Sequence, residues 1–300
     1  MPPAETAPPD AAPPDTAPPD TAPPHTIDLD HVAVAVDRHA QAFPRYAGDL
    51  GGRWLSGGFS AGFAPAQLGF LAGIRLEILA PHDIERNDFL RRFLDRNGPG
   101  PHHLTFKVPD LRALLRAAES EGYSPVNVDL SDAGWQEAFI HPKDGPGVLI
   151  QLAQVAGEEW HTPPPEGFPP PGDAEPASLV RVAHAVARID DGVRLFAGLL
   201  GGTQTARGEA AGERWVDLEW PGAGRLRLIE PVGARSPVSE WLGERPGRIH
   251  HLAFTLTDPA AVPAARRLTA EAWEVAPEDN LGVRLVLLPL TPGSEAAGLR

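Results

Sequence analysis

The 300-residue chain contains no cysteine. Disulfides, thiolate metal ligands and cysteine nucleophiles are therefore excluded. No stretch approaches the about 18 continuous apolar residues that a membrane-spanning helix needs. The N-terminus also lacks a basic segment followed by an apolar one, so we expect no secretory signal and a cytoplasmic protein.

Positive charge is scarce, since 26 Lys and Arg stand against 40 Asp and Glu and give a net charge of −14. Nucleic acids and anionic membranes attract proteins with a positive field. We therefore expect neither of them as a partner and predict a small-molecule substrate instead.

Proline is concentrated in two segments. Residues 1–24 repeat the unit APPD(A/T), which cannot bury a core and predicts a disordered tail. Residues 157–176 contain HTPPPEGFPPPGDAEP, which is typical of a semi-rigid linker. These segments separate two pieces of similar size, a first domain at 25–156 and a second at 177–295.

The two pieces resemble each other, which indicates a duplicated domain. Four matches occur in one order at nearly one offset: LGG at 50–52 and 200–202, RLE at 75–77 and RLR at 225–227, HHL at 102–104 and 250–252, and His31 and His184. A weaker repeat within the first piece relates His31 to His103 and Glu77 to Gln151. Each domain is therefore expected to consist of two modules.

Each module begins with a short alternating strand that runs into an acidic helix-start signal. These strands are predicted at 31–36, 103–108, 184–189 and 251–256, with the signals at Asp37, Asp110, Asp190 and Asp258. Amphipathic helices are predicted after the last three signals, whereas Pro44 should end or kink the first helix early. Glycine-rich turns then separate about three strands. The predicted order is βαβββ, an α+β fold.

Strand alternation places four polar side chains on the face opposite the aliphatic one. In 31–36 the valines share one face, which should pack under the helix. His31 shares the other face with Ala33 and Ala35, whose small side chains should leave room for a ligand. Glu77, His103 and Gln151 occupy the non-aliphatic faces of their strands in the same way.

If these strands share one curved sheet, two imidazoles, a carboxylate and an amide converge. Such donors suit zinc, iron(II), cobalt, nickel or manganese and leave positions open for substrate. Calcium prefers more oxygen ligands. The alternative is that each residue is an ordinary satisfied polar group on its own strand.

The segments LDHVAVAV, IRLEILAP, FLDRNGPGPHHLTFKVPD and FIHPKDGPGVLIQLAQ resemble the vicinal oxygen chelate superfamily, and most closely methylmalonyl-CoA epimerases. The resemblance covers nearly all of 27–154 and implies paired βαβββ modules in a U-shaped sheet around a divalent metal. Carried over by position, the implied ligands are His31, Glu77, His103 and Gln151, and His102, which precedes the ligand His103, should point away from it.

The chain departs from the epimerase pattern at two places. The resemblance implies a glutamate on the last strand that serves as both ligand and base, but Gln151 cannot take a proton. Epimerases also tend to carry an acid before the third strand, where SAGFAPAQLGF has none. We therefore assign no epimerase activity and place proton transfer on Glu77 or on a residue that the sequence does not identify.

The second domain offers His184, Arg227, His251 and Val286 at the matching places. An arginine repels a cation and valine has no donor, so we expect no metal there. This domain would complete the fold as an internal pseudo-dimer partner or bind an anion at Arg227. Pairing into a homodimer stays open.

Two function classes follow. The first is a metal-dependent lyase or isomerase that stabilises an enolate of an oxygen-rich substrate, with Arg75, Lys107 and Lys143 as candidate substrate contacts. A ring-cleaving dioxygenase is a variant of it. The second is a metal-free sequestering protein of the bleomycin-resistance type. Its cleft would be aromatic, although core packing is the more ordinary role of Trp54, Trp135, Trp215 and Trp220.

Overall fold

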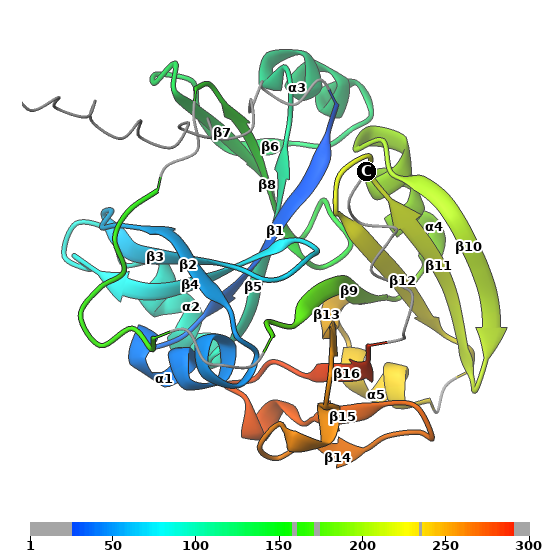
Figure 1. The fold of residues 1–300 in the computed structure, drawn as a ribbon. Coiled ribbons are helices and arrows are strands. Elements are labelled where there is room, and N and C mark those ends of the chain that lie inside the picture. The colour runs from blue at the N-terminus through cyan, green and yellow to red at the C-terminus, as the bar shows by residue number, and fades with distance from the viewer. Residues whose placement is uncertain (1–25, 158–160, 171–174, 234–235, 291–300) are drawn as a thin grey trace, which may run out of the picture.

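The computed structural model describes residues 26–157, 161–170, 175–233 and 236–290. Two eight-stranded mixed sheets, each strongly curved, dominate the molecule (Figure 1). We call the part that forms the first sheet the first domain and the other the second domain. The proline-rich tail at 1–24 lies outside the described residues.

The first domain contains eight strands and three α-helices. Its elements are β1 Asp28–Ala35, α1 His39–Phe43, β2 Arg53–Gly57, β3 Gly62–Gly69, β4 Arg75–His82, α2 Phe89–Asn97, β5 Gly100–Lys107, α3 Leu111–Ser120, β6 Pro125–Asp129, β7 Trp135–Ile140 and β8 Leu149–Val155. The strand order is β2-β3-β4-β1-β5-β8-β7-β6, with β1 parallel to β4 and β5 parallel to β8.

The second domain repeats this plan with shorter helices. Its elements are β9 Ser178–Val186, α4 Ile189–Val193, β10 Thr203–Ala210, β11 Glu213–Glu219, β12 Arg225–Pro231, α5 Pro237–Leu242, β13 Gly247–Leu256, β14 Arg266–Arg267, β15 Trp273–Val275 and β16 Leu285–Pro289. The order β10-β11-β12-β9-β13-β16-β15-β14 matches that of the first sheet. The predicted α+β fold of tandem domains with paired βαβββ modules is confirmed.

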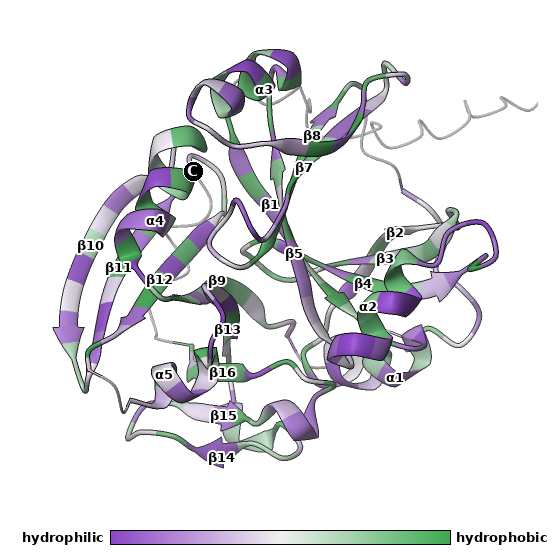
Figure 2. Cartoon of the chain, turned by 180° about the vertical axis from the view of Figure 1, so that it is seen from behind, coloured by the Kyte–Doolittle hydropathy of each residue, from purple (hydrophilic) through white to green (hydrophobic). Residues whose placement is uncertain are grey.

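Successive side chains of a strand point to opposite faces of the sheet, so apolar and polar residues separate onto two faces. The hydropathy colours accordingly alternate along β11 and β12 (Figure 2). Val32 and Val34 of β1 and Val36 directly after it belong to the main core with Ala42 and Phe43 of α1, as predicted. The opposite face was expected to be open beside Ala33 and Ala35. Instead α2, which the sequence analysis missed, covers both alanines with Leu90 and Leu94.

Pro44 ends the first α-helix early, as predicted: α1 stops at Phe43, and the chain continues as a π-helical segment, Pro44–Asp49. The helix predicted after Asp258 needs correction. After Asp258 only a 3-10 turn forms, Pro259–Ala261. Asp258 does cap this turn, but Pro263 disfavours the helical conformation of the residue before it, and Val262 is extended.

The two domains share one hydrophobic core. Phe106 packs against Phe196 and Trp220 of the second domain, at ring-centroid distances of 6.1 and 5.2 Å. Asn280 donates a hydrogen bond to the Tyr46 hydroxyl across the same boundary at 3.1 Å. The duplicated domains therefore form an internal pseudo-dimer.

The described part of the linker, residues 161–170, packs on the first domain. The Trp54 indole donates to the Thr162 carbonyl oxygen at 2.7 Å, and Phe168 contacts Trp54 and Phe43 edge to face. Within the described residues, no helix is both long and apolar enough to cross a membrane.

Candidate metal centre

Three side chains from neighbouring strands meet on the inner face of the first sheet. His31 comes from β1, Glu77 from β4 and His103 from β5, and β1 lies between the other two strands. The register places Ala33 opposite both Glu77 and His103, so the two polar residues flank β1 at one level. All three are buried, with 2, 8 and 5 % of their surface exposed.

The geometry of this cluster fits a divalent cation. The Nε2 atoms of His31 and His103 lie 3.5 and 3.6 Å from the same Glu77 oxygen, Oε2. Both nitrogens are buried and have no hydrogen-bond partner among the described residues. Buried polar atoms are normally satisfied, so two orphaned ones that face one carboxylate suit a shared metal ligand set.

Asp30 fixes the orientation of His31, and the sequence analysis missed it. Its Oδ2 accepts a hydrogen bond from His31 Nδ1 at 2.7 Å, and its Oδ1 lies 3.0 Å from Lys107 Nζ. Alternation would put Asp30 on the opposite face, but a register shift between Leu29 and His31 brings the two side chains together. A carboxylate on the second imidazole nitrogen is a common support for metal-binding histidines.

His102 does not point away, contrary to expectation. Its Nδ1 lies 2.8 Å from Nδ1 of His103, and its ring packs on Phe93 of α2 at 4.6 Å. The β1–β5 pairing skips His102 between the Val34–Pro101 and Ala33–His103 pairs. Such a bulge turns consecutive side chains toward one side of the sheet. The contact leaves His103 Nε2 directed at Glu77.

Burial and the neighbouring charges shift the pKa values of all three residues in the cluster. Burial opposes the charge on His31, but Glu77 and Asp30 raise its pKa to about 9. Burial likewise opposes the charge on Glu77, yet His31 and His103 lower its pKa to about 2. Burial lowers the pKa of His103 to about 3, and the neighbouring His102 adds to this. His103 is therefore neutral at pH 7, the form that binds metals.

Gln151 of β8 is held at the edge of the cluster. Its Oε1 accepts from the Thr105 hydroxyl at 2.7 Å, and its Nε2 donates to Glu137 Oε2 at 2.7 Å. Glu137, on β7, also accepts from the Trp135 indole at 3.0 Å. The sequence analysis missed Glu137; its only signal was a charged residue on the non-aliphatic face of an alternating strand.

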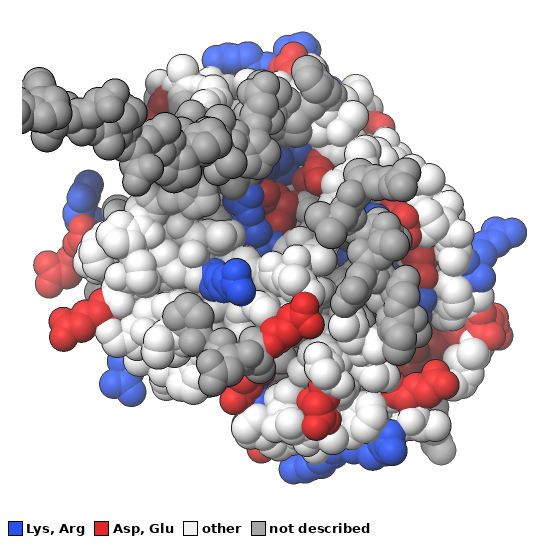
Figure 3. All heavy atoms as spheres, in the orientation of Figure 1, with Lys and Arg blue, Asp and Glu red and all other residues white. Residues whose placement is uncertain are grey.

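The three predicted substrate contacts occupy different environments. Lys107 is half-buried and paired with Asp30, so it stands beside the cluster. Arg75 is half-buried opposite His31 in the β1–β4 register. Lys143 is exposed in the turn after β7, where its backbone N–H donates to His141. Acidic and basic side chains gather in a hollow near β1 (Figure 3).

The tryptophans chiefly serve packing. Trp54 binds the linker, and Trp220 is buried in the domain boundary with its indole donating to the Leu200 carbonyl. Trp215 lies under Arg227, whose guanidinium carbon is 4.3 Å from the ring centroid. Trp135 alone of these four borders the metal cluster, through Glu137.

The second domain has a different set of polar residues from the one that the internal sequence repeat predicted. Arg227 pairs with Ala183 as Glu77 pairs with Ala33, so the counterpart of His31 is Arg181. His184 corresponds instead to Val34 and is fully buried in the core. The offset-based match was wrong because it aligned identical residues rather than strand register.

The His250–His251 pair repeats the contact of His102 and His103, with Nδ1 atoms 2.9 Å apart. Here Arg284 Nη1 lies 2.8 Å from His250 Nε2, and a guanidinium can only donate. His250 must then carry its proton on Nδ1 and donate to His251. Among the described residues, only the first-domain cluster brings together three possible metal ligands of the His, Asp or Glu type.

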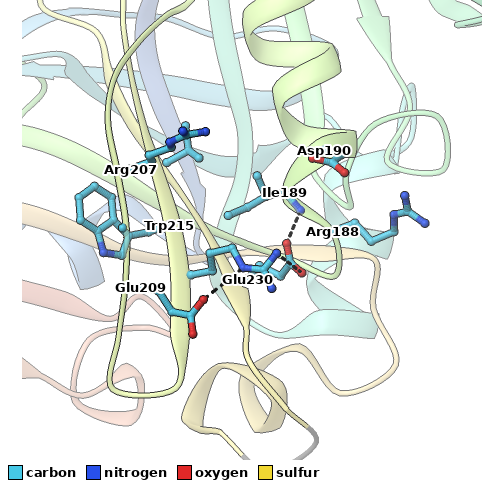
Figure 4. A pocket seen from close by; sticks show the side chains of 10 residues that line it. Arg188, Ile189, Asp190, Arg207, Glu209, Trp215 and Glu230 are labelled. Atoms are coloured by element: carbon cyan, nitrogen blue, oxygen red, sulfur yellow. Dashed lines mark hydrogen bonds and ion pairs between the residues drawn. The ribbon is translucent and has the colours of Figure 1, made fainter.

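A separate hollow of about 750 Å³ lies in the second domain, between the start of α4 and the strands β10 to β12 (Figure 4). Its charged side chains contact each other: Arg214 lies 3.7 Å from Glu209 and 3.9 Å from Glu230. Glu230 also accepts from the Ile189 backbone N–H. No lining residue belongs to the first sheet, so this hollow is not part of the metal centre.

Comparisons with known proteins agree with this description. Residues 30–139 match the model of the Glyoxalase/Bleomycin resistance protein/Dioxygenase superfamily. Human mitochondrial methylmalonyl-CoA epimerase is 28% identical over 136 residues, which are 42% of this chain and 73% of the human protein. The crystal structure of methylmalonyl-CoA epimerase from Mycobacterium tuberculosis is 32% identical, covers 43% of this chain and 89% of that one, and has a TM-score of 0.40.

A mutant of 4-hydroxymandelate synthase from Streptomyces coelicolor spans both domains. It covers 87% of this chain and 92% of its own, with 14% identity and a TM-score of 0.62. At that identity the likeness concerns the fold. The family assignment follows from the match over residues 30–139 and the 32% identity to the epimerase: the chain belongs to the glyoxalase/bleomycin resistance protein/dioxygenase superfamily.

Proposed function

We propose that the chain is a divalent-metal-dependent enzyme whose metal is held by His31, Glu77 and His103, with the Gln151 amide oxygen as a further ligand. The observation that carries the proposal is the pair of buried, unpartnered Nε2 atoms, both facing Glu77 Oε2. A metal-free sequestering protein gives no reason for two buried nitrogen atoms to face one carboxylate without a hydrogen-bond partner.

The ligand set favours zinc, iron(II), cobalt, nickel or manganese. When bound, the metal would supply Lewis acidity to an oxygen-rich substrate. Asp30 and His102 hold the Nδ1 sides of the two imidazoles, so that both Nε2 atoms face inward. These contacts orient the ligands before substrate enters, which lowers the cost of assembling the site.

We assign proton transfer during a lyase or isomerase reaction to carboxylates of this chain. Glu77 lies within the cluster, as the sequence analysis proposed. Glu137 is the second candidate, because it is half-buried and hydrogen-bonded to Gln151 at the place where the epimerase pattern has its base. Between them these two carboxylates offer the proton acceptor that Gln151 cannot be.

The decisive experiment measures bound metal in purified protein by elemental analysis. We expect close to one equivalent in the wild type and in H82A, which removes an exposed histidine at the end of β4. H103A should retain less than about a tenth of an equivalent, since it removes one of the two imidazole ligands. Metal below that level in wild-type protein, or equal contents in wild type and H103A, would contradict the proposal.

Two further variants rank the ligands. E77Q removes the only carboxylate of the three-residue cluster, so it should weaken metal binding more than Q151A, which removes a neutral amide. Equal losses would contradict this ranking. Activity is then tested by following deuterium incorporation from D₂O into methylmalonyl-CoA and into simple 2-oxo acids. Exchange by wild type that is lost in H103A would support an isomerase or lyase.

A further inference from the structure

The second domain contains a cavity beside the place that corresponds to the metal cluster of the first domain; of the counterparts of the three ligands, only Arg181 lines it. The cavity measures about 220 Å³ and is lined by Arg181, Arg225, Asp217 and Glu219, together with Val180, Leu218, Leu226 and Leu288. Arg181 stands at the position of His31, as the strand register shows. The volume is below the roughly 300–1,000 Å³ of pockets for drug-sized ligands, so a much smaller molecule would fit.

Most charges around this cavity are neutralised within the protein. Arg227 makes two hydrogen bonds of 2.6 Å to the two carboxylate oxygens of Asp217. Arg225 Nε lies 3.4 Å from Glu219 Oε2, and its Nη1 donates to backbone carbonyl oxygens of the β11–β12 turn. The anion site expected at Arg227 is therefore already filled by Asp217.

Arg181 is different. It is half-buried, and its Nε is a buried donor without a hydrogen-bond partner among the described residues. Among the described residues, Arg181 forms no ion pair with a carboxylate within 4.0 Å. Burial lowers its pKa, and Arg227 adds to this effect. Arginine keeps its charge in proteins nevertheless, so Arg181 brings a positive charge to the cavity that no described carboxylate pairs with directly.

We propose that this cavity binds a short aliphatic monocarboxylate, with its carboxylate on Arg181 and its alkyl chain against Leu288 and Val180. One negative charge balances the single unpaired guanidinium, and the planar carboxylate matches its donors. A phosphate dianion would bring a second negative charge next to Asp217 and Glu219, which disfavours it. The apolar lining accommodates a hydrocarbon tail and offers an inorganic ion no contacts.

The test is calorimetric titration of the full-length protein with butyrate, in EDTA so that no metal in the first domain binds the carboxylate. We expect saturable binding of one butyrate, and at least about tenfold weaker binding of butyramide, which lacks the charge. Inorganic phosphate should also bind more weakly than butyrate.

R181Q should weaken butyrate binding at least about tenfold, whereas R207Q, an exposed arginine on β10 outside this cavity, should bind as the wild type does. If R181Q does not fold, as judged by circular dichroism, L288W tests the same cavity by filling it, and butyrate binding should disappear. Absence of binding up to about 50 mM butyrate, or unchanged affinity in R181Q or L288W, would overturn the proposal.

Discussion

His184 should make the stability of the docked domains sensitive to mild acid. It is fully buried, and its Nε2 donates to the Pro146 carbonyl oxygen of the first domain at 2.7 Å. Its Nδ1 is buried without a hydrogen-bond partner among the described residues. A proton on that nitrogen would have no acceptor, and burial accordingly lowers the pKa of His184 from 6.5 to about 4.

The sign and size of the effect follow from proton binding. Between pH 6.5 and about 4 the unfolded chain binds this proton and the folded chain does not. The free energy of unfolding therefore falls as the pH drops through this window, and is unaffected by His184 above it. The loss should reach about 2 kcal/mol at pH 5 and about 3 kcal/mol below pH 4.

The matched variant is H184Q, because the glutamine amide can still donate to Pro146 but does not titrate. Urea unfolding at pH 7.5 and pH 5.0 should show that H184Q loses about 2 kcal/mol less than the wild type between the two values. H82Q, at an exposed histidine, should behave as the wild type does. If wild type and H184Q lose equal stability within about 0.5 kcal/mol, the reasoning about His184 is refuted.

Two other perturbations have definite expected outcomes. D30N should weaken metal binding by about 10- to 100-fold in a competition assay with a chromogenic chelator, because it removes the charged partner of His31 Nδ1. G247A should lower the unfolding free energy by at least about 1–3 kcal/mol in urea, since a Cβ there would collide with the Pro146 backbone across the domain boundary.

Each of these two predictions has a control. D37N changes an aspartate whose partner is Arg91 on the exposed side of the first domain, so it should leave metal affinity unchanged. G198A adds a methyl group where no atom lies within 4 Å, and it should not destabilise the protein. Equal metal affinities of D30N and wild type, or equal stabilities of G247A and G198A, would contradict the respective argument.

Much of the site could be predicted from the sequence because the information is local. Alternation along a strand has a period of two, so His31, Glu77, His103 and Gln151 could each be placed on the non-aliphatic face without knowledge of their neighbours. The internal repeat then indicated that these faces belong to one sheet. The structure brings three of the four into one buried cluster, with Gln151 held beside it.

What the sequence missed depends on pairing between distant segments. Asp30 and His102 contact the histidines only because β1 and β5 shift register at bulges, and a bulge is a property of two paired strands. Arg181 escaped notice for the same reason: strand register, and not sequence identity, decides which residue of the second domain replaces His31.

The sequence by itself therefore determined the duplication, the βαβββ order and the polar faces, all of which follow from short-range periodicity and repeated motifs. Only the tertiary structure decided which nitrogen atoms face Glu77, that α2 covers part of the inner face, and that Arg181 Nε has no hydrogen-bond partner among the residues that the structure describes. Those features arise where strands far apart in the chain pair and pack, and no local pattern encodes their register.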